Sequence, residues 1–217
     1  MLKFDIYYGG SMLARWLIIF SILLLSAGCD ELAHLSDPPK QLVVQVGKSS
    51  NVRDIERILK MRFAEYPAAV FSSVKSKTVQ DRIIFTFEKG APVREIVDFF
   101  VSHKGRLVGR TEKGDIWFSD KDIVSASVKY AENSNFLTFT LLEVAAQRIG
   151  QLSEHNIGKV LIVDFDGERL VTAKVMAKLG KRFQVDVNKD AKELLLIAAI
   201  LRSEVLPEKV TVLKNEI

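Results

Sequence analysis

The sequence predicts an α+β fold made of two units: a first unit with the element order βαββαβ, and a second unit that also mixes strands and helices. Short runs rich in valine, isoleucine and phenylalanine alternate with segments whose apolar residues recur at helical spacing. Proline, glycine and Asp-Gly turn signals separate these runs. Hydrophobic residues make up 48% and charged residues 27% of the 217 positions, a composition typical of a folded protein.

The first predicted unit spans residues 41–118. Apolar residues at three- and four-residue intervals between Val52 and Phe63 predict a helix that Asn51 can cap. Alternating apolar residues around Phe85 predict a strand. The predicted elements are strands at 41–47, 69–74 and 82–88, helices at 52–63 and 92–101, and strand segments at 106–109 and 115–118. This order is the split βαβ pattern of a ferredoxin-like sandwich, in which helices cover one face of an antiparallel sheet.

The second predicted unit spans residues 119–217. An Asp-Gly pair at Asp166 and Gly167 follows a nearly continuous apolar strand, which is a signal for a tight hairpin turn. A leucine- and alanine-rich segment predicts a long helix, and Pro207 separates it from a last strand. The predicted elements are strands at 123–130, 135–140, 159–166, 169–175, 182–187 and 209–213, and helices at 143–152 and 189–202.

An apolar segment precedes both units. Residues 17–25 are apolar apart from Ser21 and follow the positive Arg15. This run is shorter than the roughly 20 residues that a membrane-spanning helix needs, and its length fits the core of a signal peptide. Translation can begin at Met1 or at Met12, because the first eleven residues fit poorly with the positively charged start of such a peptide.

The stretch that ends this segment, Leu-Ser-Ala-Gly-Cys29, resembles the lipobox of bacterial lipoproteins. The resemblance implies a signal peptide at 1–28, cleavage before Cys29, a lipid such as palmitate on Cys29, and a tether at 29–40. Ser26 stands where many lipoboxes have leucine, and an ordinary signal peptide or an uncleaved anchor is the alternative. In Gram-negative lipoproteins that this chain resembles, an aspartate at the position of Asp30 retains the protein in the inner membrane.

Charge and cysteine content exclude several function classes. The net charge of +4 arises from mixed signs and gives no strong case for nucleic-acid binding. A single cysteine excludes an internal disulfide and a thiolate metal cluster. His103 and His155 have no cysteine or carboxylate at ligand spacing, so we expect no metal site. We also expect no cofactor.

Three stretches of the sequence carry a resemblance to a known family. They are Ser153-Glu-His-Asn-Ile-Gly158-Lys159, the strand that follows it through Gly167, and the helix end Ala199-Ile-Leu-Arg-Ser-Glu-Val-Leu-Pro207. Together they resemble the head of the first periplasmic domain of SecD, the export-assisting subunit of the Sec translocon. Residues 81–90 resemble the base of the same domain, so the resemblance covers about residues 40–214. It implies a ferredoxin-like base at 41–118 and a SecD-head-like subdomain at 119–217.

This sequence departs from the SecD pattern at several points. Glu204 stands where the family has glycine, and Val171-Thr-Ala-Lys174 stands where it has a small-residue stretch ending in proline. Within these 217 residues we find no counterpart of the six transmembrane helices or of the acidic residues of proton coupling. The resemblance therefore implies a module that binds a substrate or a partner, and it does not imply a proton-driven motor.

Two carboxylates are candidates for acid–base chemistry. Asp164 and Asp166 lie two residues apart on the predicted strand, about 7 Å from each other on one face. Paired carboxylates can act together as a general acid and a general base. The alternative is structural, because Asp166 belongs to the predicted turn and Asp164 lies near the strand end. We favour the structural role and expect no enzymatic activity.

Two groups of residues are candidates for partner binding. Lys174, Lys178, Lys181 and Arg182 form a basic cluster that suits anionic headgroups or an acidic partner. The alternative is a solvated charged hairpin. Tyr130 and Phe136 lie on a predicted edge hairpin, and edge strands can bind extended chains. The alternative is that both aromatic residues belong to the core.

The sequence leaves three functions open. The first is a lipid-anchored module at the periplasmic face of the inner membrane, which engages exported polypeptides or a Sec-type membrane complex. The second is a structural accessory subunit with one fixed partner. The third, an envelope hydrolase, is the least favoured, and the outer membrane is the alternative location.

Overall fold

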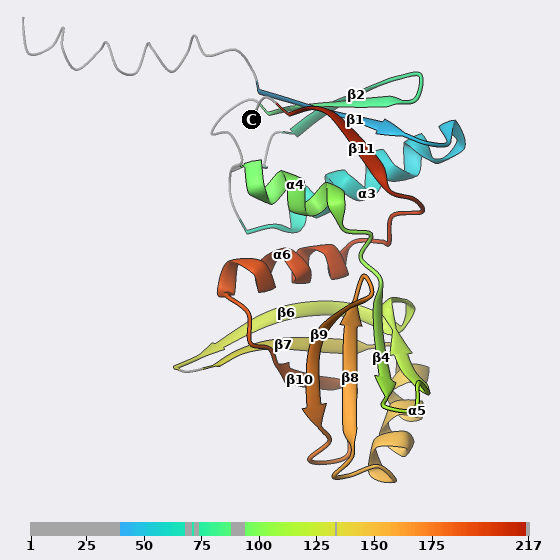
Figure 1. The fold of residues 1–217 in the computed structure, drawn as a ribbon, viewed down its shortest axis with the longest axis vertical. Coiled ribbons are helices and arrows are strands. Elements are labelled where there is room, and N and C mark those ends of the chain that lie inside the picture. The colour runs from blue at the N-terminus through green and yellow to red at the C-terminus, as the bar shows by residue number, and fades with distance from the viewer. Residues whose placement is uncertain (1–39, 68–70, 72–73, 88–93, 133, 216–217) are drawn as a thin grey trace, which may run out of the picture. The chain divides into compact units, whose positions relative to one another are not determined.

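The computed structural model of the chain describes residues 40–67, 71, 74–87, 94–132 and 134–215 (Figure 1). The expected signal peptide and tether, with Cys29 and Asp30, lie outside these residues, as do most of the predicted strand at 69–74 and the predicted helix start at Pro92. The predicted α+β class is confirmed, because helices and several antiparallel sheets alternate along the described chain.

A four-stranded antiparallel sheet forms the base, with the strand order β11-β1-β3-β2. This is the strand order of a ferredoxin-like fold, and its helices α3 and α4 lie on one face of the sheet (Figure 1). The strands are β1 (Lys40–Val46), β2 (Val74–Val79), β3 (Arg82–Phe87) and β11 (Val210–Asn215), and the helices are α3 (Val52–Glu65) and α4 (Arg94–Ser102). Asn51 flanks α3 as predicted, but its amide donates to Glu208 at 3.0 Å instead of capping the helix.

The fourth strand of the base comes from the far end of the chain, which corrects the prediction. The segments at 106–109 and 115–118 were expected to complete the base sheet, but β11 pairs with β1 instead. They form β4 (Leu107–Thr111) and β5 (Ile116–Ser119), which belong to a second sheet. A hydrophobic pattern predicts a strand without identifying the strand it pairs with, so the pairing of β11 with β1 could not be predicted from the sequence. We propose that the head is inserted between α4 and β11, in place of a boundary at residue 118.

The head contains two further antiparallel sheets. One has the order β5-β4-β8-β9 and the other the order β10-β7-β6. The predicted tight turn between β8 and β9 is confirmed, because Asp166 and Gly167 have φ angles of 51° and 89°. The remaining head elements are β6 (Ile123–Ala131), β7 (Ser134–Leu141), α5 (Glu143–Glu154), β8 (Val160–Phe165), β9 (Glu168–Lys174), β10 (Arg182–Asp186) and α6 (Ala191–Arg202).

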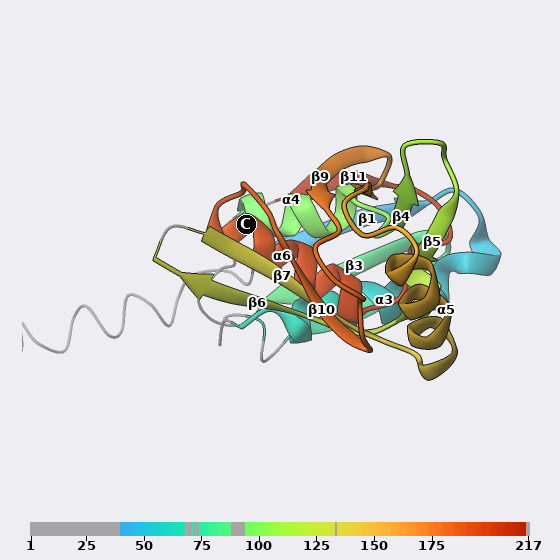
Figure 2. The ribbon, with the colours of Figure 1, turned by 90° about the horizontal axis from the view of Figure 1, so that it is seen from below.

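Helix α6 is shared by the base and the head. It packs against α3 and α4 on one side and against β6 and β7 on the other (Figures 1 and 2). A helix that is apolar around most of its circumference is buried on both sides, as here. Its side chains of Leu194, Leu196, Ile197, Ala198, Ala199, Ile200 and Leu201 are all buried. The Asp190 carboxylate caps the helix by accepting from the Glu193 N–H at 2.7 Å.

An aromatic cluster fills the core of the base. The Phe63 ring lies 5.3 Å from that of Phe71, 5.5 Å from that of Phe85 and 5.9 Å from that of Phe100. Phe85 and Phe100 are fully buried. These edge-to-face and stacked contacts add to the stabilisation from apolar burial.

Among the described helices, none combines the length and the apolar character that a membrane span requires.

We expect the fragment of residues 40–217 to be soluble and folded without detergent. In that fragment, Phe85→Ala or Phe100→Ala should lower the free energy of unfolding by about 3–5 kcal/mol, because each leaves a cavity in a packed core. Urea unfolding followed by circular dichroism measures this loss. Ile116→Ala is the control, since Ile116 is 64% exposed and its truncation should change stability by less than about 0.5 kcal/mol. A detergent requirement, or equal effects at all three positions, would contradict the core assignment.

Candidate functional site

The Arg62 guanidinium joins the two connectors that link the base to the head, residues 103–106 and 203–209. Arg62 projects from α3 and is fully buried. Its Nη1 donates to the Phe100 carbonyl at 2.6 Å and to the His103 carbonyl at 2.5 Å. Its Nη2 donates to the Lys104 carbonyl at 2.7 Å and to the Glu204 carbonyl at 3.4 Å, and Nε donates to Ser203 Oγ at 3.2 Å. One side chain therefore holds both connectors against α3.

This arrangement satisfies groups that would otherwise lack partners. The last four carbonyls of a helix receive no hydrogen bond from the N–H groups of that helix, and α4 ends at Ser102. The planar guanidinium offers five N–H donors in a fixed geometry, which matches several converging carbonyls. Burial lowers the pKa of Arg62 to about 9, with the nearby Asp166 charge opposing the shift. Arg62 therefore remains charged at neutral pH.

Asp166 holds the first connector from the head side. Its carboxylate accepts from the backbone N–H of Gly105 at 3.0 Å and from that of Arg106 at 2.8 Å. Gly105 has a φ of 94°, and a Cβ there would lie 2.7 Å from the Ile200 side chain, so the position requires glycine. The β8–β9 turn, the connector and α6 are thus closely fitted. Asp166 has the structural role that the sequence favoured.

Asp164 is also neutralised by its neighbours. Its carboxylate accepts from Arg110 Nε at 2.6 Å and from Arg169 Nε at 3.1 Å. These contacts link β4, β8 and β9 across one sheet. Each of the two predicted carboxylates therefore has its own structural donors, and this geometry favours the structural alternative over shared acid–base chemistry.

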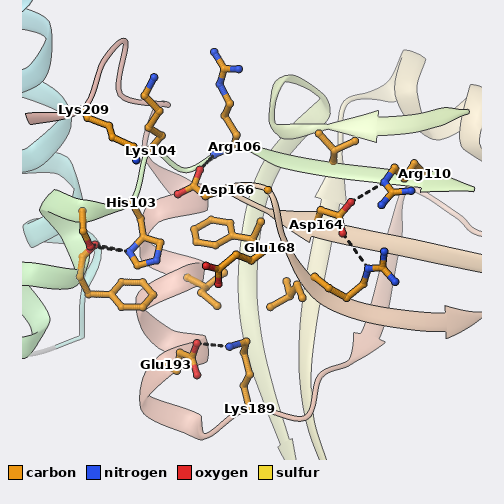
Figure 3. A pocket seen from close by; sticks show the side chains of 18 residues that line it. His103, Lys104, Arg106, Arg110, Asp164, Asp166, Glu168, Lys189, Glu193 and Lys209 are labelled. Atoms are coloured by element: carbon orange, nitrogen blue, oxygen red, sulfur yellow. Dashed lines mark hydrogen bonds and ion pairs between the residues drawn. The ribbon is translucent and has the colours of Figure 1, made fainter. Parts of the chain in front are cut away.

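A cavity of about 640 Å³ opens beside the first connector. The end of α4, the connector, the β8–β9 turn and the start of α6 contribute its walls (Figure 3). The His103 ring lies between two aromatic rings, 4.0 Å from that of Phe99 and 5.6 Å from that of Phe165. His103 Nδ1 lies 2.9 Å from the Phe99 carbonyl oxygen, which fixes the ring against the end of α4.

Three cations line one side of this cavity, which we call the junction pocket. Lys104, Arg106 and Lys209 lie along the same rim in Figure 3, and within the described chain none of them forms an ion pair. By contrast, Lys189 pairs with Glu193. Glu168 also projects into the pocket (Figure 3). The pocket therefore offers stacked aromatic surface next to both signs of charge.

The predicted basic cluster is partly neutralised. Lys178 pairs with Glu154 at 2.9 Å and Lys181 pairs with Glu143 at 3.0 Å. Lys174 and Arg182 are exposed, and neither has an ion-pair partner among the described residues. The structure thus leaves two of the four cations available to a partner. The role of all four in binding stays a prediction.

The predicted edge hairpin exposes one of its two aromatic residues. Tyr130 is 51% exposed, whereas Phe136 is partly buried. Arg202 Nη1 donates to the Ala126 carbonyl at 2.8 Å, and the same side chain binds Glu65. Arg202 therefore covers part of the β6 edge. The role of Tyr130 and Phe136 in partner binding stays a prediction.

His155 is exposed, and its Nδ1 lies 2.8 Å from the Gln151 carbonyl oxygen at the end of α5. Among the residues that the structure describes, no three histidine, cysteine, aspartate or glutamate side chains gather as a metal site would require. We find no reason in the described part of the chain to assign a bound metal or cofactor.

Comparisons with known proteins agree with the resemblance read from the sequence. Residues 102–208 match the family model described as SecDF, P1 head subdomain. The chain is 28% identical over 180 residues to the protein translocase subunit SecD of Aquifex aeolicus, covering 81% of this chain and 35% of that protein. It is 28% identical over 105 residues to the SecD of Acidaminococcus fermentans, covering 25% of that protein. The chain thus spans about a third or less of the length of these relatives.

Two solved structures share the fold. One is described as a membrane component SecDF that enhances protein export; it matches with a TM-score of 0.60 and 16% identity over 80% of this chain and 98% of that chain. The other, SecDF in a super-membrane-facing form, matches with a TM-score of 0.62 and 15% identity over 81% of this chain and 30% of that chain. Both the base and the head are included, so the resemblance to the first periplasmic domain extends beyond the head.

Sequence reasoning missed Arg62 and the cations of the junction pocket. One signal for Arg62 was available. It lies three residues after Leu59 and four after Ile58, on the stripe that otherwise carries the apolar residues of α3. A cation on such a stripe must find acceptors in the interior. No comparable pattern identifies Lys104, Arg106 and Lys209, since the fold alone brings them together.

We expect Arg62→Met to lower the free energy of unfolding by about 3 kcal/mol. The substitution keeps the apolar stem and leaves several carbonyls without a donor, at about 1–3 kcal/mol for each one that stays buried. Arg57→Met in the same helix is the matched control. Its salt bridge with Glu204, at 2.6 Å, is exposed and screened by solvent, so its loss should lower the free energy of unfolding far less than the loss of Arg62. Urea unfolding of both variants measures the difference, and equal losses would refute the special role of Arg62.

Proposed function

From the resemblance to the first periplasmic domain of SecD, we propose that this chain is a lipid-anchored periplasmic binding module of the cell envelope. It engages exported polypeptides or a Sec-type translocon partner and has no enzymatic activity. The observation that carries the proposal is the match of both subdomains, base and head, to a solved SecDF chain over 98% of that chain. The matched relatives are translocase subunits, and one solved structure is described as enhancing protein export.

The junction pocket supports the binding role. It places the Phe99, His103 and Phe165 rings next to a rim of cations. Aromatic surface and scattered charge allow weak contact with many sequences, as a receptor for unfolded chains requires. The neutralised carboxylates Asp164 and Asp166 support the absence of hydrolytic chemistry.

The proposed location is the periplasmic face of the inner membrane. Three features support it: the lipobox-like stretch before Cys29, the aspartate at position 30, and the translocase subunits among the relatives. One acyl chain gives marginal membrane binding and two or more give stable anchoring. The lipid would therefore hold the described unit beside membrane complexes.

Site-specific photocrosslinking in living cells tests the function. A photoreactive residue at Lys104, on the rim of the junction pocket, should crosslink to many pulse-labelled precursors, and the crosslinks should disappear during a chase as export is completed. The same probe at Lys113, in the β4–β5 turn away from the pocket, is the control. A single stoichiometric partner that persists through the chase would instead favour an accessory subunit with one fixed partner.

The lipid anchor has a separate test. We expect Cys29→Ser to abolish labelling by a fatty-acid probe and to leave an unprocessed or soluble protein, because the thiol is the only attachment point in the sequence. In-gel detection of the probe measures this loss. Ser26→Ala, which keeps the cysteine, should still be labelled. Equal labelling of the wild type and the Cys29→Ser protein would refute the lipoprotein assignment.

A further inference from the structure

Two edge strands of the head border a common groove. Strand β9 is the last strand of the sheet β5-β4-β8-β9, and β10 is an edge of the sheet β10-β7-β6. A groove of about 1080 Å³ follows β9, with the consecutive residues Arg169 to Lys174 along one wall. Residues 186–189, at the end of β10, contribute to the opposite wall. The β6–β7 turn also lines the groove, through Ala131, Glu132, Ser134 and Asn135.

The backbone of β9 turns unpaired groups away from β8. The Val175 N–H donates to the Lys159 carbonyl at 2.9 Å, and the Val175 carbonyl accepts from the Gly158 N–H at 2.8 Å. Because antiparallel strands alternate the direction of their backbone groups, Val171 and Ala173 also bond toward β8. The N–H and C=O groups of Thr172 and Lys174 then point outward. Within the described chain, β9 pairs with β8 and with no other strand.

The side chains of β9 suit an added strand. Val171 packs against the core and Ala173 is partly buried, whereas Thr172 and Lys174 are exposed. Met176 is 78% exposed and lies at the end of the groove. On a strand added beside β9, an apolar residue opposite Val171 or Ala173 would thus be partly covered. A polar residue opposite Thr172 would face water.

Among the described residues, the edge of β9 is not closed by a side-chain hydrogen bond, in contrast to the predicted β6 edge. On β6 the residues with outward-facing groups are Ala126, Val128 and Tyr130, as the Arg202 contact with the Ala126 carbonyl shows. Arg202 is in turn held by Glu65 at 2.6 Å. The β6 edge is therefore shortened by a side chain of the protein itself. Neither outward group of Thr172 or Lys174 is covered in this way among the described residues.

We propose that an extended segment of an unfolded polypeptide adds to β9 as an antiparallel fifth strand. The groove walls span six residues of β9, which corresponds to about 20 Å of extended chain. Main-chain hydrogen bonds supply affinity with little dependence on sequence, and alternate apolar residues contact the Val171 and Ala173 side. This inference rests on the proposed function and assigns it a second contact surface, separate from the junction pocket.

Backbone-modified peptides test the inference without altering the protein. The probe is a fluorescein-labelled eight-residue peptide of alternating valine and threonine, titrated against the full chain in detergent micelles by fluorescence anisotropy. With valines opposite Val171 and Ala173, the threonine N–H groups face β9 and the valine N–H groups face away. N-methylation of the threonines should weaken binding at least tenfold, and N-methylation of the valines should leave it within about twofold, because only the threonine N–H groups donate to the β9 backbone. Equal loss in both series, or no loss in either, overturns the proposal.

A protein variant provides the second arm. Thr172→Pro removes one outward N–H and leaves the bonds to β8 in place, so it should weaken the unmodified peptide about tenfold. Thr172→Val is the matched control, because it changes the side chain and keeps the N–H. Reduced, carboxymethylated α-lactalbumin serves as a second probe of unfolded chain. If the wild type binds it and Thr172→Pro binds both probes equally well, β9 is not the site and the proposed function stands. If the wild type binds neither probe, both proposals fail.

Discussion

The buried guanidinium of Arg62 is the interaction on which the arrangement of this molecule depends. It donates to carbonyls of Phe100 and Lys104, at the end of α4 and in the first connector, and of Glu204 in the second connector, so one group of α3 holds two segments that are distant from it in sequence. Its bonds to Ser203 and Glu204 also hold the end of α6 against the base. The junction pocket lies directly beside the first connector, residues 103–106, so the walls of the pocket depend on the contacts that Arg62 makes.

Surface ion pairs also join the base to α6 and to the second connector, but they stabilise the protein less than Arg62 does. Arg57 pairs with Glu204, Arg202 with Glu65, and Lys192 with Glu95, and each pair joins the base to α6 or to the connector that follows it. Exposed pairs contribute little stability, because solvent and salt screen them. The apolar faces of α6 and the buried Arg62 contribute more. The side chains of α6 are removed from water, and the carbonyls that Arg62 binds would have no other donor in the interior. The head is therefore carried on the base through one shared helix layer.

The sequence predicted local elements better than their partners. The apolar stripe of α3, the alternation around Phe85 and the Asp-Gly turn at Asp166 each depend on neighbours within a few residues, and each was predicted. The pairing of β11 with β1 joins segments about 170 residues apart, and no local pattern encodes it. The same limit applies to the site. Asp166 was recognised as a turn residue, but its bonds to Gly105 and Arg106 and the rim of Lys104, Arg106 and Lys209 arise from the long-range fold.

Native-state hydrogen exchange tests most directly whether Arg62 and α6 join the base and the head into one cooperative unit. Mass spectrometry of exchange in increasing urea gives an opening free energy for amides of β3 in the base and of β7 in the head. We predict that the slowest amides of both strands exchange through the same global opening, with equal free energies and equal urea dependence. In Arg62→Met the two opening free energies should separate. A wild-type head that opens at least 2 kcal/mol below the base would contradict the account.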